Sequence, residues 1–412
     1  MSKRTSLLSV LCLVAVVLSC SVLAAEKVTI TYGNFSAGSD NAATLNAMVK
    51  AFQKANPSIE VKLQSGGYGD YFTLLQTQVA GGTAPDCYEL NYENFVTYAA
   101  SGVTLDLGSM GLSRKAYNQN ALNAFSYKGH QYGLPGSFSV VLLIYNKDLF
   151  DKAKVAYPTA NWTWNDVVEV GKKIRALGDN IFGLSQPVQF WEFYKVIAQN
   201  GSSLFNADRT KFAVNSPANV EALQYLVDNV NKSNIVPTQA QLSSQGDWDM
   251  FTSGRLGMIV TGNWAFTNFT ANAKFPWDIM VEPGNKKKAC HFFSNGMVID
   301  KASKHPKEAF KWINWLSASR ASSLLRIKAG WETPPVADQE IIDLYSSQTP
   351  PDSREMVFES LKYLVTPPVT TQFAEMSGII DTEIAKARDM LKTPQQALDD
   401  AQKELEQRKI KL

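Results

Sequence analysis

The chain has 412 residues, a formal net charge of +2 and 45% hydrophobic residues. A near-neutral chain lacks the excess of basic side chains that attracts nucleic acids and other polyanions, so its charge disfavours those partners. Single hydrophobic cores stop growing at roughly 250 to 300 residues, and the length therefore predicts at least two lobes with a cleft between them.

Residues 1–25 have the features of an export signal. Two basic residues precede an apolar run over residues 7–18, and small residues follow it. That order is typical of signal peptides, and the run is shorter than the roughly 20 residues of a spanning helix. We expect a periplasmic or extracellular protein. Cleavage near Ala24 would release it freely, whereas the segment that ends at Cys20 resembles a lipoprotein box, in which Cys20 would become a lipid-modified anchor.

Strand and helix patterns alternate after the signal. Apolar patterns predict strands over residues 28–32, 59–63 and 86–90. Helical spacing of apolar residues predicts helices over residues 45–52 and 72–79. Successive strand-helix-strand units are typical of an α/β fold, and they predict a mostly parallel sheet covered by helices.

The later part of the chain is mainly helical around one buried strand. A continuous apolar run predicts a buried strand over residues 140–145. Helices are predicted over residues 167–177, 220–230 and 309–316, and a last helix begins after its cap, Thr393. The sequence contains no internal repeat and no low-complexity linker, which favours lobes built from non-contiguous segments.

The histidines and cysteines form no metal-ligand pattern. His130, His291 and His305 are scattered, and none has a ligand spacing to a cysteine or a carboxylate. Without the signal only Cys87 and Cys290 remain, too few for a disulfide framework. They could pair, but we expect two isolated buried thiols. We therefore expect no metal and no cofactor.

Several sequence blocks resemble, in the same order, ABC-transporter extracellular solute-binding proteins. The sugar-binding branch, which includes maltodextrin- and oligosaccharide-binding proteins, fits best. Each block alone is a weak signal, and their collinearity over nearly the whole mature chain carries the resemblance. The blocks are Asn34-Phe35 and residues 52–61, 82–86 (GTAPD), 127–135, 144–150 (IYNKDLF), 162–166 (WTWND), 251–258, 262–265 (GNWA) and 304–312.

The resemblance implies a two-lobe periplasmic-binding-protein fold with a hinge and a ligand cleft between the lobes. Residues 26–137 and 291–335 would form the N-terminal lobe, and residues 142–288 and 340–412 the C-terminal lobe. Such a protein is a monomer that captures a sugar or oligosaccharide and delivers it to the membrane permease of an ABC importer. The resemblance implies no nucleic-acid partner and no enzymatic activity.

A sugar presents apolar C–H faces and a ring of hydroxyls, so its site needs aromatic platforms with Asp, Glu, Asn or Gln at their edges. The predicted loops of this chain supply both kinds of side chain. Trp264 matches the family's stacking tryptophan, and Glu93 is the nearest match to its acidic residue. The predicted ligand-binding residues are Asn34, Phe35, Ser36, Asp40, Tyr68, Asn91, Tyr92, Glu93, Trp191, Trp264, Phe292 and Trp331.

Structural roles compete with some of these assignments. Trp264 and Trp331 could instead pack in a core, and Asp40 could simply cap a helix. Glu93 could lie on a solvated face. The tryptophans that we expect to be structural are Trp162, Trp164, Trp312 and Trp315.

Three other functions remain open from the sequence. The cleft could hold another small solute, such as a polyol, a glycerol phosphodiester or a polyamine. A secreted glycoside hydrolase would use two carboxylates, and Asp247 with Asp249 or Glu89 with Glu93 are close in sequence. The chain has no G-x-S-x-G, H-E-x-x-H or phosphate-loop pattern, which disfavours an enzyme. An adhesin would close on no small ligand.

Overall fold

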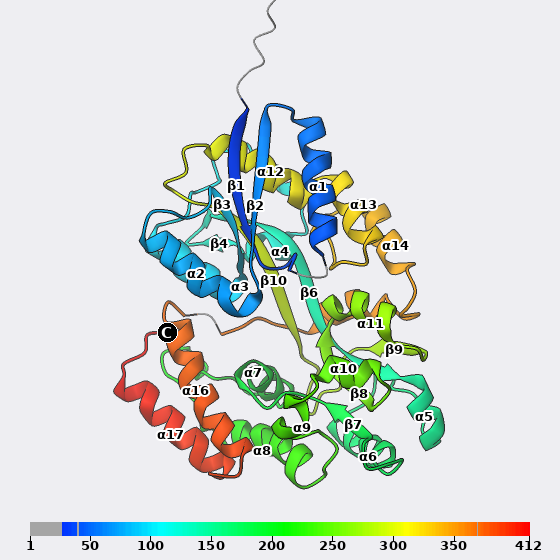
Figure 1. Cartoon of the computed structure of the whole chain (residues 1–412). Coiled ribbons are helices and arrows are strands. Elements are labelled where there is room, and N and C mark those ends of the chain that lie inside the picture. Colours follow the sequence, from blue (N-terminus) through cyan, green and yellow to red (C-terminus); the bar gives the residue numbers. More distant parts are fainter. Residues whose placement is uncertain (1–26, 39–40, 369) are drawn as a thin grey trace, which may run out of the picture.

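A computed structural model describes residues 27–38, 41–368 and 370–412. Figure 1 shows two lobes, one above the other, joined by the long strands β6 (Gly133–Asn146) and β10 (Cys290–Ile299). We call the upper lobe, which contains the start of the described chain, the first lobe, and the lower one the second lobe. The expected export signal and Asp40 lie outside the described residues, and the residue boundaries predicted for the lobes stay a prediction.

One mixed sheet of nine strands runs through both lobes of the described chain, in the order β2-β1-β3-β10-β6-β8-β7, with β9 beside β6 and β11 beside β10. β1 pairs in parallel with β2 and β3, as the strand-helix-strand units predict. β7 also pairs in parallel with β8. The other strands are β1 (Val28–Asn34), β2 (Ile59–Ser65), β3 (Cys87–Asn91), β7 (Phe182–Ser185), β8 (Leu256–Gly262), β9 (Trp277–Met280) and β11 (Leu364–Val365), with β4 (Ser126–Tyr127) and β5 (His130–Gln131) forming a separate pair.

The prediction of a mostly parallel sheet was wrong at its centre. β10 runs antiparallel to β3 and β6, and β6 runs antiparallel to β8. The reason is the path of the chain: β6 leads from the first lobe to the second, and β10 leads back (Figure 1). Two neighbouring strands that carry the chain in opposite directions between the lobes must pair antiparallel.

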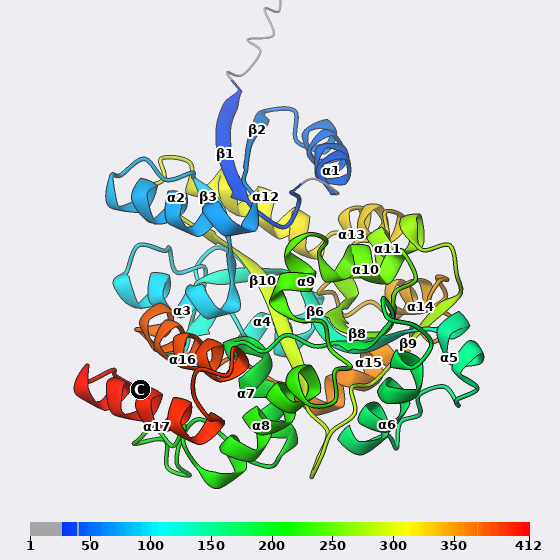
Figure 2. The same cartoon turned by 60° about the horizontal axis from the view of Figure 1, so that its bottom comes forward.

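Helices pack around the sheet in both lobes, and Figure 2 shows α16 beside α3 and α17 beside α8. The helices of the first lobe and its margin are α1 (Ala42–Ala55), α2 (Tyr68–Ala80), α3 (Tyr92–Ser101), α4 (Gln119–Asn123), α12 (Pro306–Ala318), α13 (Arg320–Lys328) and α14 (Gln339–Ser346). The others are α5 (Lys147–Ala153), α6 (Trp164–Arg175), α7 (Phe190–Gln199), α8 (Pro217–Asn231), α9 (Gln239–Ser243), α10 (Asp247–Thr252), α11 (Phe266–Asn272), α15 (Met356–Ser360), α16 (Phe373–Arg388) and α17 (Pro394–Gln407). Short 3-10 helices are η1 (Arg114–Ala116), η2 (Asn263–Ala265) and η3 (Leu361–Tyr363).

Local sequence explains where these helices begin. At α17, the Thr393 hydroxyl accepts a hydrogen bond from Gln396 N at 3.2 Å, and Gln396 Oε1 accepts one from Thr393 N at 3.0 Å. Pro394 occupies the first helical position, where no backbone donor is needed. Four apolar residues at helical spacing are buried on the inner face of α17. The predicted C-terminal helix is therefore confirmed.

Separate hydrophobic cores lie in the two lobes. The core of the first lobe packs β1 and α1 against α12, with Trp312 at its centre and Trp315 packed against it. The largest core of the second lobe packs α7, α8, α16 and α17 around β6 and β8, with Trp164 buried and Trp162 at its edge. These four tryptophans are structural, as predicted.

Three segments of chain cross between the lobes side by side. β6 and β10 pair along their middle portions, from Phe292 opposite Val140 onward. Phe138 N donates a hydrogen bond to Thr333 O at 3.3 Å, so the segment that follows Gly330 runs beside β6. All three crossings therefore lie side by side between the lobes.

Cys87 and Cys290 are both buried and unpaired, so the expectation of two isolated thiols is confirmed and the pairing is not. Within the described ranges, no helix has the length and apolar character to cross a membrane.

Candidate functional site

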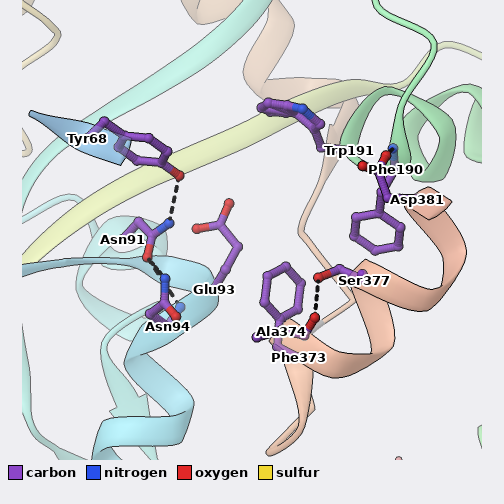
Figure 3. A pocket seen from close by; sticks show the side chains of 11 residues that line it. Tyr68, Asn91, Glu93, Asn94, Phe190, Trp191, Phe373, Ala374, Ser377 and Asp381 are labelled. Atoms are coloured by element: carbon purple, nitrogen blue, oxygen red, sulfur yellow. Dashed lines mark hydrogen bonds between the residues drawn. The ribbon is translucent and has the colours of Figure 1, made fainter. Parts of the chain in front are cut away.

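Two adjoining cavities lie between the lobes. The inner cavity has a volume of about 430 Å³ and is lined by Phe35, Ser36, Tyr68, Asn91, Glu93, Ser139, Trp191, Trp264, Phe293, Ser294, Asn295 and Glu332. The outer cavity has a volume of about 360 Å³ and is lined by Tyr68, Asn91, Glu93, Asn94, Phe190, Trp191, Phe373, Ala374, Ser377, Gly378 and Asp381 (Figure 3). Because the cavities share Tyr68, Asn91, Glu93 and Trp191, we treat them as one cleft.

An aromatic cluster forms the side of the cleft nearest the second lobe. Phe293 in β10 is its centre, with Trp191 perpendicular to it at a centroid distance of 5.6 Å and Trp264 inclined by 64° at 5.7 Å. His291 stacks on Phe293 at a centroid distance of 5.0 Å. Burial, together with nearby Lys195, holds the pKa of His291 well below its ordinary value, so its ring packs as a neutral group. The cluster offers flat apolar surfaces of the kind that stack on sugar rings.

Trp264 owes its position to the glycine two residues before it. It lies in η2, directly after β8. A Cβ atom on Gly262 would overlap the Trp264 indole, so only glycine leaves room for the ring to fold back over the strand end.

Tyr68 forms the opposite wall, on the first lobe. It is the first residue of α2, is 60% exposed, and packs edge-to-face on Phe35 at a centroid distance of 5.4 Å. Asn91 Nδ2 donates to the Tyr68 hydroxyl at 3.2 Å, and Asn91 Oδ1 accepts from Asn94 N at 3.3 Å, which caps α3 (Figure 3). Desolvation and nearby Glu93 raise the pKa of Tyr68 to about 12, so its hydroxyl stays protonated.

Glu93 places a carboxyl group between the two walls. It lies in the first turn of α3, lines both cavities, and points into the space between α3 and α16 (Figure 3). Desolvation raises its pKa to about 7. When ionised, it can accept hydrogen bonds from ligand hydroxyls; when protonated, it can also donate one.

Glu89 supports the loop that carries Phe35 and Ser36. Its Oε2 accepts hydrogen bonds from Phe35 N at 3.1 Å and Ser36 N at 3.0 Å. The Tyr71 hydroxyl donates to the backbone oxygen of Glu89 at 2.9 Å. Glu89 is buried, and desolvation raises its pKa above the ordinary value. Its carboxylate is thus occupied in shaping the cleft wall.

The cleft lining carries negative charge only. Its ionisable acids are Glu93, Glu332 and Asp381, and its described residues include no lysine, arginine or histidine. The positive charge of Arg326 partly balances Glu332: Arg326 Nη1 lies 3.9 Å from Glu332 Oε2, and its guanidinium lies over the Trp331 ring. Such a lining disfavours anionic ligands. In the described residues, no group of three or more His, Cys, Asp or Glu could hold a metal ion.

The structure brings together most of the predicted site residues. Those that line the cleft are Phe35, Ser36, Tyr68, Asn91, Glu93, Trp191 and Trp264. Whether they contact ligand stays a prediction. Asn34 and Tyr92 lie next to lining residues but do not line either cavity; the buried Asn34 amide donates to Ser65 Oγ at 3.0 Å instead.

Phe292 and Trp331 do not line the cleft, whereas the residue that follows each of them does. Phe292 is 4% exposed and packs with Phe138 and Ala121, whereas its neighbour Phe293 faces the cavity. Trp331 is likewise 4% exposed in the first-lobe core, and Glu332 lines the cavity. Alternate side chains of an extended segment point to opposite sides, so an error of one residue reverses the assignment.

Sequence reasoning missed the lining residues on the crossing strands and on α16. Those on the crossings are Ser139, Phe293, Ser294, Asn295 and Glu332, and those from elsewhere are Asn94, Phe190, Phe373, Ala374, Ser377, Gly378 and Asp381. No alternating pattern marks the crossing strand, because Phe292 and Phe293 are adjacent and Ser294 and Asn295 follow them. The sequence of α16 contains no signal either, because its lining residues resemble an ordinary helix surface.

Two α/β lobes with a cleft of aromatic rings and carboxyl groups define a protein of the solute-binding class. The chain matches the family described as bacterial extracellular solute-binding protein over residues 37–322, well over half of its length. It therefore belongs to that family.

Solved structures and curated relatives agree with this assignment. An ABC substrate-binding protein of Listeria monocytogenes, solved in complex with cycloalternan, is 45% identical, with a TM-score of 0.90 over 94% of this chain and 100% of that one. The arabinooligosaccharide-binding protein of Bacillus subtilis is 24% identical over 390 residues, 88% of each chain. A putative binding protein of Brucella abortus is 24% identical over 276 residues; the match spans 65% of this chain and 66% of that protein.

Proposed function

We propose that this protein captures a neutral oligosaccharide in the cleft between its lobes and delivers it, unaltered, to the membrane permease of an ABC importer. The observation that carries the proposal is the facing of two walls, with Trp191, Phe293 and Trp264 on one side and Tyr68 with Glu93 on the other. Aromatic faces stack on the C–H surfaces of a sugar, and carboxylate and amide groups bind its hydroxyls.

The extent of the cleft favours more than one sugar unit. The two cavities continue into each other past Tyr68 and Trp191, which are both well exposed to them. The Listeria relative holds cycloalternan, a cyclic saccharide, and the Bacillus relative is named for arabinooligosaccharides. We therefore infer that the ligand is a linear or cyclic oligosaccharide.

The carboxylate pairs considered for hydrolysis do not support an enzyme. Glu89 accepts two backbone N–H groups, so it does not face Glu93 across a substrate. Asp247 is the first residue of α10, its Oδ1 accepts a hydrogen bond from Trp248 N at 2.9 Å, and it does not line the cleft. We infer that the protein releases its ligand unchanged.

One observation favours a second candidate, a polyamine. Glu93, Glu332 and Asp381 line the cleft, no lysine, arginine or histidine among the described residues lines it, and a protonated amine would pair with these acids. A glycerol phosphodiester fits less well because its phosphate would meet those same carboxylates.

For location, we propose export through residues 1–25, with either a free mature chain or one anchored through Cys20. Mass spectrometry of the mature N-terminus in the producing cell would separate the two forms. A terminus near Glu26 without lipid indicates the free form, and a lipidated Cys20 indicates the anchored form.

Titration of the mature chain tests the proposed function. Intrinsic tryptophan fluorescence would be followed against cycloalternan, maltotriose, glucose, spermidine and glycerophosphocholine, and each mixture would then be chromatographed. We expect saturable binding of an oligosaccharide that is recovered intact. Saturable binding of spermidine alone, weakened by salt, would support the polyamine instead. Shortened saccharides would contradict both proposals.

A further inference from the structure

Asn263 is a buried residue that precedes Trp264 in η2 and is 1% exposed. Its Oδ1 accepts a hydrogen bond from Val140 N at 3.1 Å. Its Nδ2 donates to Thr333 Oγ1 and to the Tyr345 hydroxyl, each at 3.2 Å. One amide side chain thus joins η2, β6, the crossing segment after Gly330, and α14.

The partners of this amide stand next to residues that line the cleft. Val140 follows Ser139, Thr333 follows Glu332, and Asn263 itself precedes Trp264. Asn263 does not line either cavity. A shift of the amide would therefore move three lining residues at once, through the peptide bonds that connect them to its anchors.

The same contacts reach two of the three lobe crossings. Val140 lies in β6. Thr333 contacts β6 both through Asn263 and directly, because its backbone oxygen accepts a hydrogen bond from Phe138 N at 3.3 Å. Asn263 belongs to the second lobe side of the cleft through β8 and η2. The network is buried, and a donor or acceptor left without its partner there is costly, so the geometry is strongly held.

We propose that Asn263 is a positioning residue for the ligand site. It holds Trp264 in place relative to Ser139 and Glu332, which lie on the two crossings that its amide contacts. The proposal rests on the proposed function, since these three residues matter only if the cleft binds ligand. A binding constellation works when its groups are held to within about 0.5 Å by supporting contacts, and Asn263 provides that support.

A second buried asparagine provides a matched control. Asn219 in α8 is 0% exposed, and its Nδ2 donates to Ser203 O, Ala213 O and Val214 O at 2.9, 2.9 and 3.2 Å. None of these partners adjoins a residue that lines the cleft. Substitution of Asn219 by alanine therefore removes a comparable network from the second-lobe core without touching the site.

The experiment compares Asn263→Ala with Asn219→Ala in the mature chain. The dissociation constant for cycloalternan and the thermal midpoint of the unliganded protein are measured for both. We expect both variants to melt earlier, and only Asn263→Ala to weaken binding, by about tenfold or more. Equal affinities of the two variants would overturn the proposal.

Two milder variants keep the test decisive if Asn263→Ala does not fold. Thr333→Val and Tyr345→Phe each remove one hydroxyl that accepts from Asn263 Nδ2 and leave the fold intact in shape. We expect each to weaken binding by about threefold, as the loss of one hydrogen bond does. Wild-type affinity in both variants would overturn the proposal.

A readout without ligand separates this proposal from the proposed function. The Trp264 indole N–H signal in the NMR spectrum, assigned with Trp264→Phe, reports the position of the ring. We expect it to shift in Asn263→Ala and to stay in place in Asn219→Ala. If wild-type protein binds no saccharide, the proposed function fails, while an unmoved indole signal in Asn263→Ala overturns the positioning role.

Discussion

The indole of Trp264 and the ring of Phe293 meet at an inclination of 64°, with their centroids 5.7 Å apart, although the two residues come from different elements, η2 and β10. Phe293 lies on a strand that crosses between the lobes, and Trp264 follows a strand of the second lobe. The contact therefore ties an aromatic platform of the cleft to the crossing that joins its walls.

Replacing Trp264 by alanine removes that platform. We expect Trp264→Ala to weaken saccharide binding by about 2 kcal/mol or more, roughly thirtyfold in Kd, as loss of a buried aromatic anchor does. Trp315→Ala is the control, because Trp315 stacks on Trp312 in the first-lobe core at 6.1 Å. Titration calorimetry should find near-wild-type affinity in the control. A folded Trp264→Ala protein that binds equally well would remove this residue from the site.

Replacing Gly262 by alanine should also weaken saccharide binding, because the added methyl group would displace the Trp264 indole. Gly262 has a φ of −90°, which alanine adopts freely, and the three atoms nearest to an added Cβ all belong to the Trp264 indole. We expect Gly262→Ala to weaken binding about tenfold or more and to alter tryptophan fluorescence. Gly67→Ala, where a Cβ meets nothing within 4 Å, should leave affinity unchanged even though it adjoins Tyr68. Equal affinities in the two variants would show that the indole tolerates the methyl group.

Glu93 should give binding and stability opposite dependences on pH. Its pKa rises from the ordinary 4.5 to about 7 in the folded protein, so the folded state holds more protons than the unfolded state in that window. Its contribution to the free energy of unfolding is therefore present below about pH 4.5 and is lost as the pH rises through 7. Affinity should rise over the same range, because the ionised carboxylate is the stronger acceptor for sugar hydroxyls.

Glu93→Gln isolates this contribution from that of other acids. We expect the variant to lose the rise in affinity between pH 6 and 8 and to unfold less readily than wild type at pH 8. Calorimetric titrations and thermal melts at both pH values measure the two effects. Parallel pH profiles for the two proteins would mean that Glu93 does not titrate in the cleft.

Cys87 and Cys290 should be dispensable for binding. Both thiols are buried, burial raises the pKa of each, and neither lines the cleft. We expect both to resist iodoacetamide in the folded protein and to react fully in denaturant. The double variant Cys87→Ala/Cys290→Ala should bind with wild-type Kd. A large loss of affinity, with the melting temperature unchanged, would place a thiol at the site.

The sequence predicted the parts of this protein that local patterns determine. Alternating apolar residues identified β1, and the Thr393-Pro394 start with its apolar face identified α17. The direction of β6 and β10 could not be predicted, because it depends on which lobe each strand enters. Tyr68 and Trp191 were predicted as aromatic residues in or beside loops; both line the cleft, but they lie in the first turns of α2 and α7.

Two errors in the predicted site are shifts of one residue along an extended segment. Phe293 and Glu332 line the cleft, while the sequence pointed to Phe292 and Trp331. Which side of an extended crossing faces the cleft is set by packing against the partner strand, and no local pattern encodes it. Asp381 comes from α16, a helix that packs on α7, α8 and α17 and also contacts α3 of the first lobe, so only long-range packing brings it to the cleft.

A crystal structure of the mature protein with cycloalternan tests the central claim most directly. We predict that the saccharide lies between Tyr68 and Trp264, intact, with its hydroxyls within hydrogen-bond distance of Glu93. A saccharide bound outside the two cavities, or indoles of Trp191 and Trp264 that make no contact with it, would contradict the assignment of this cleft as the ligand site.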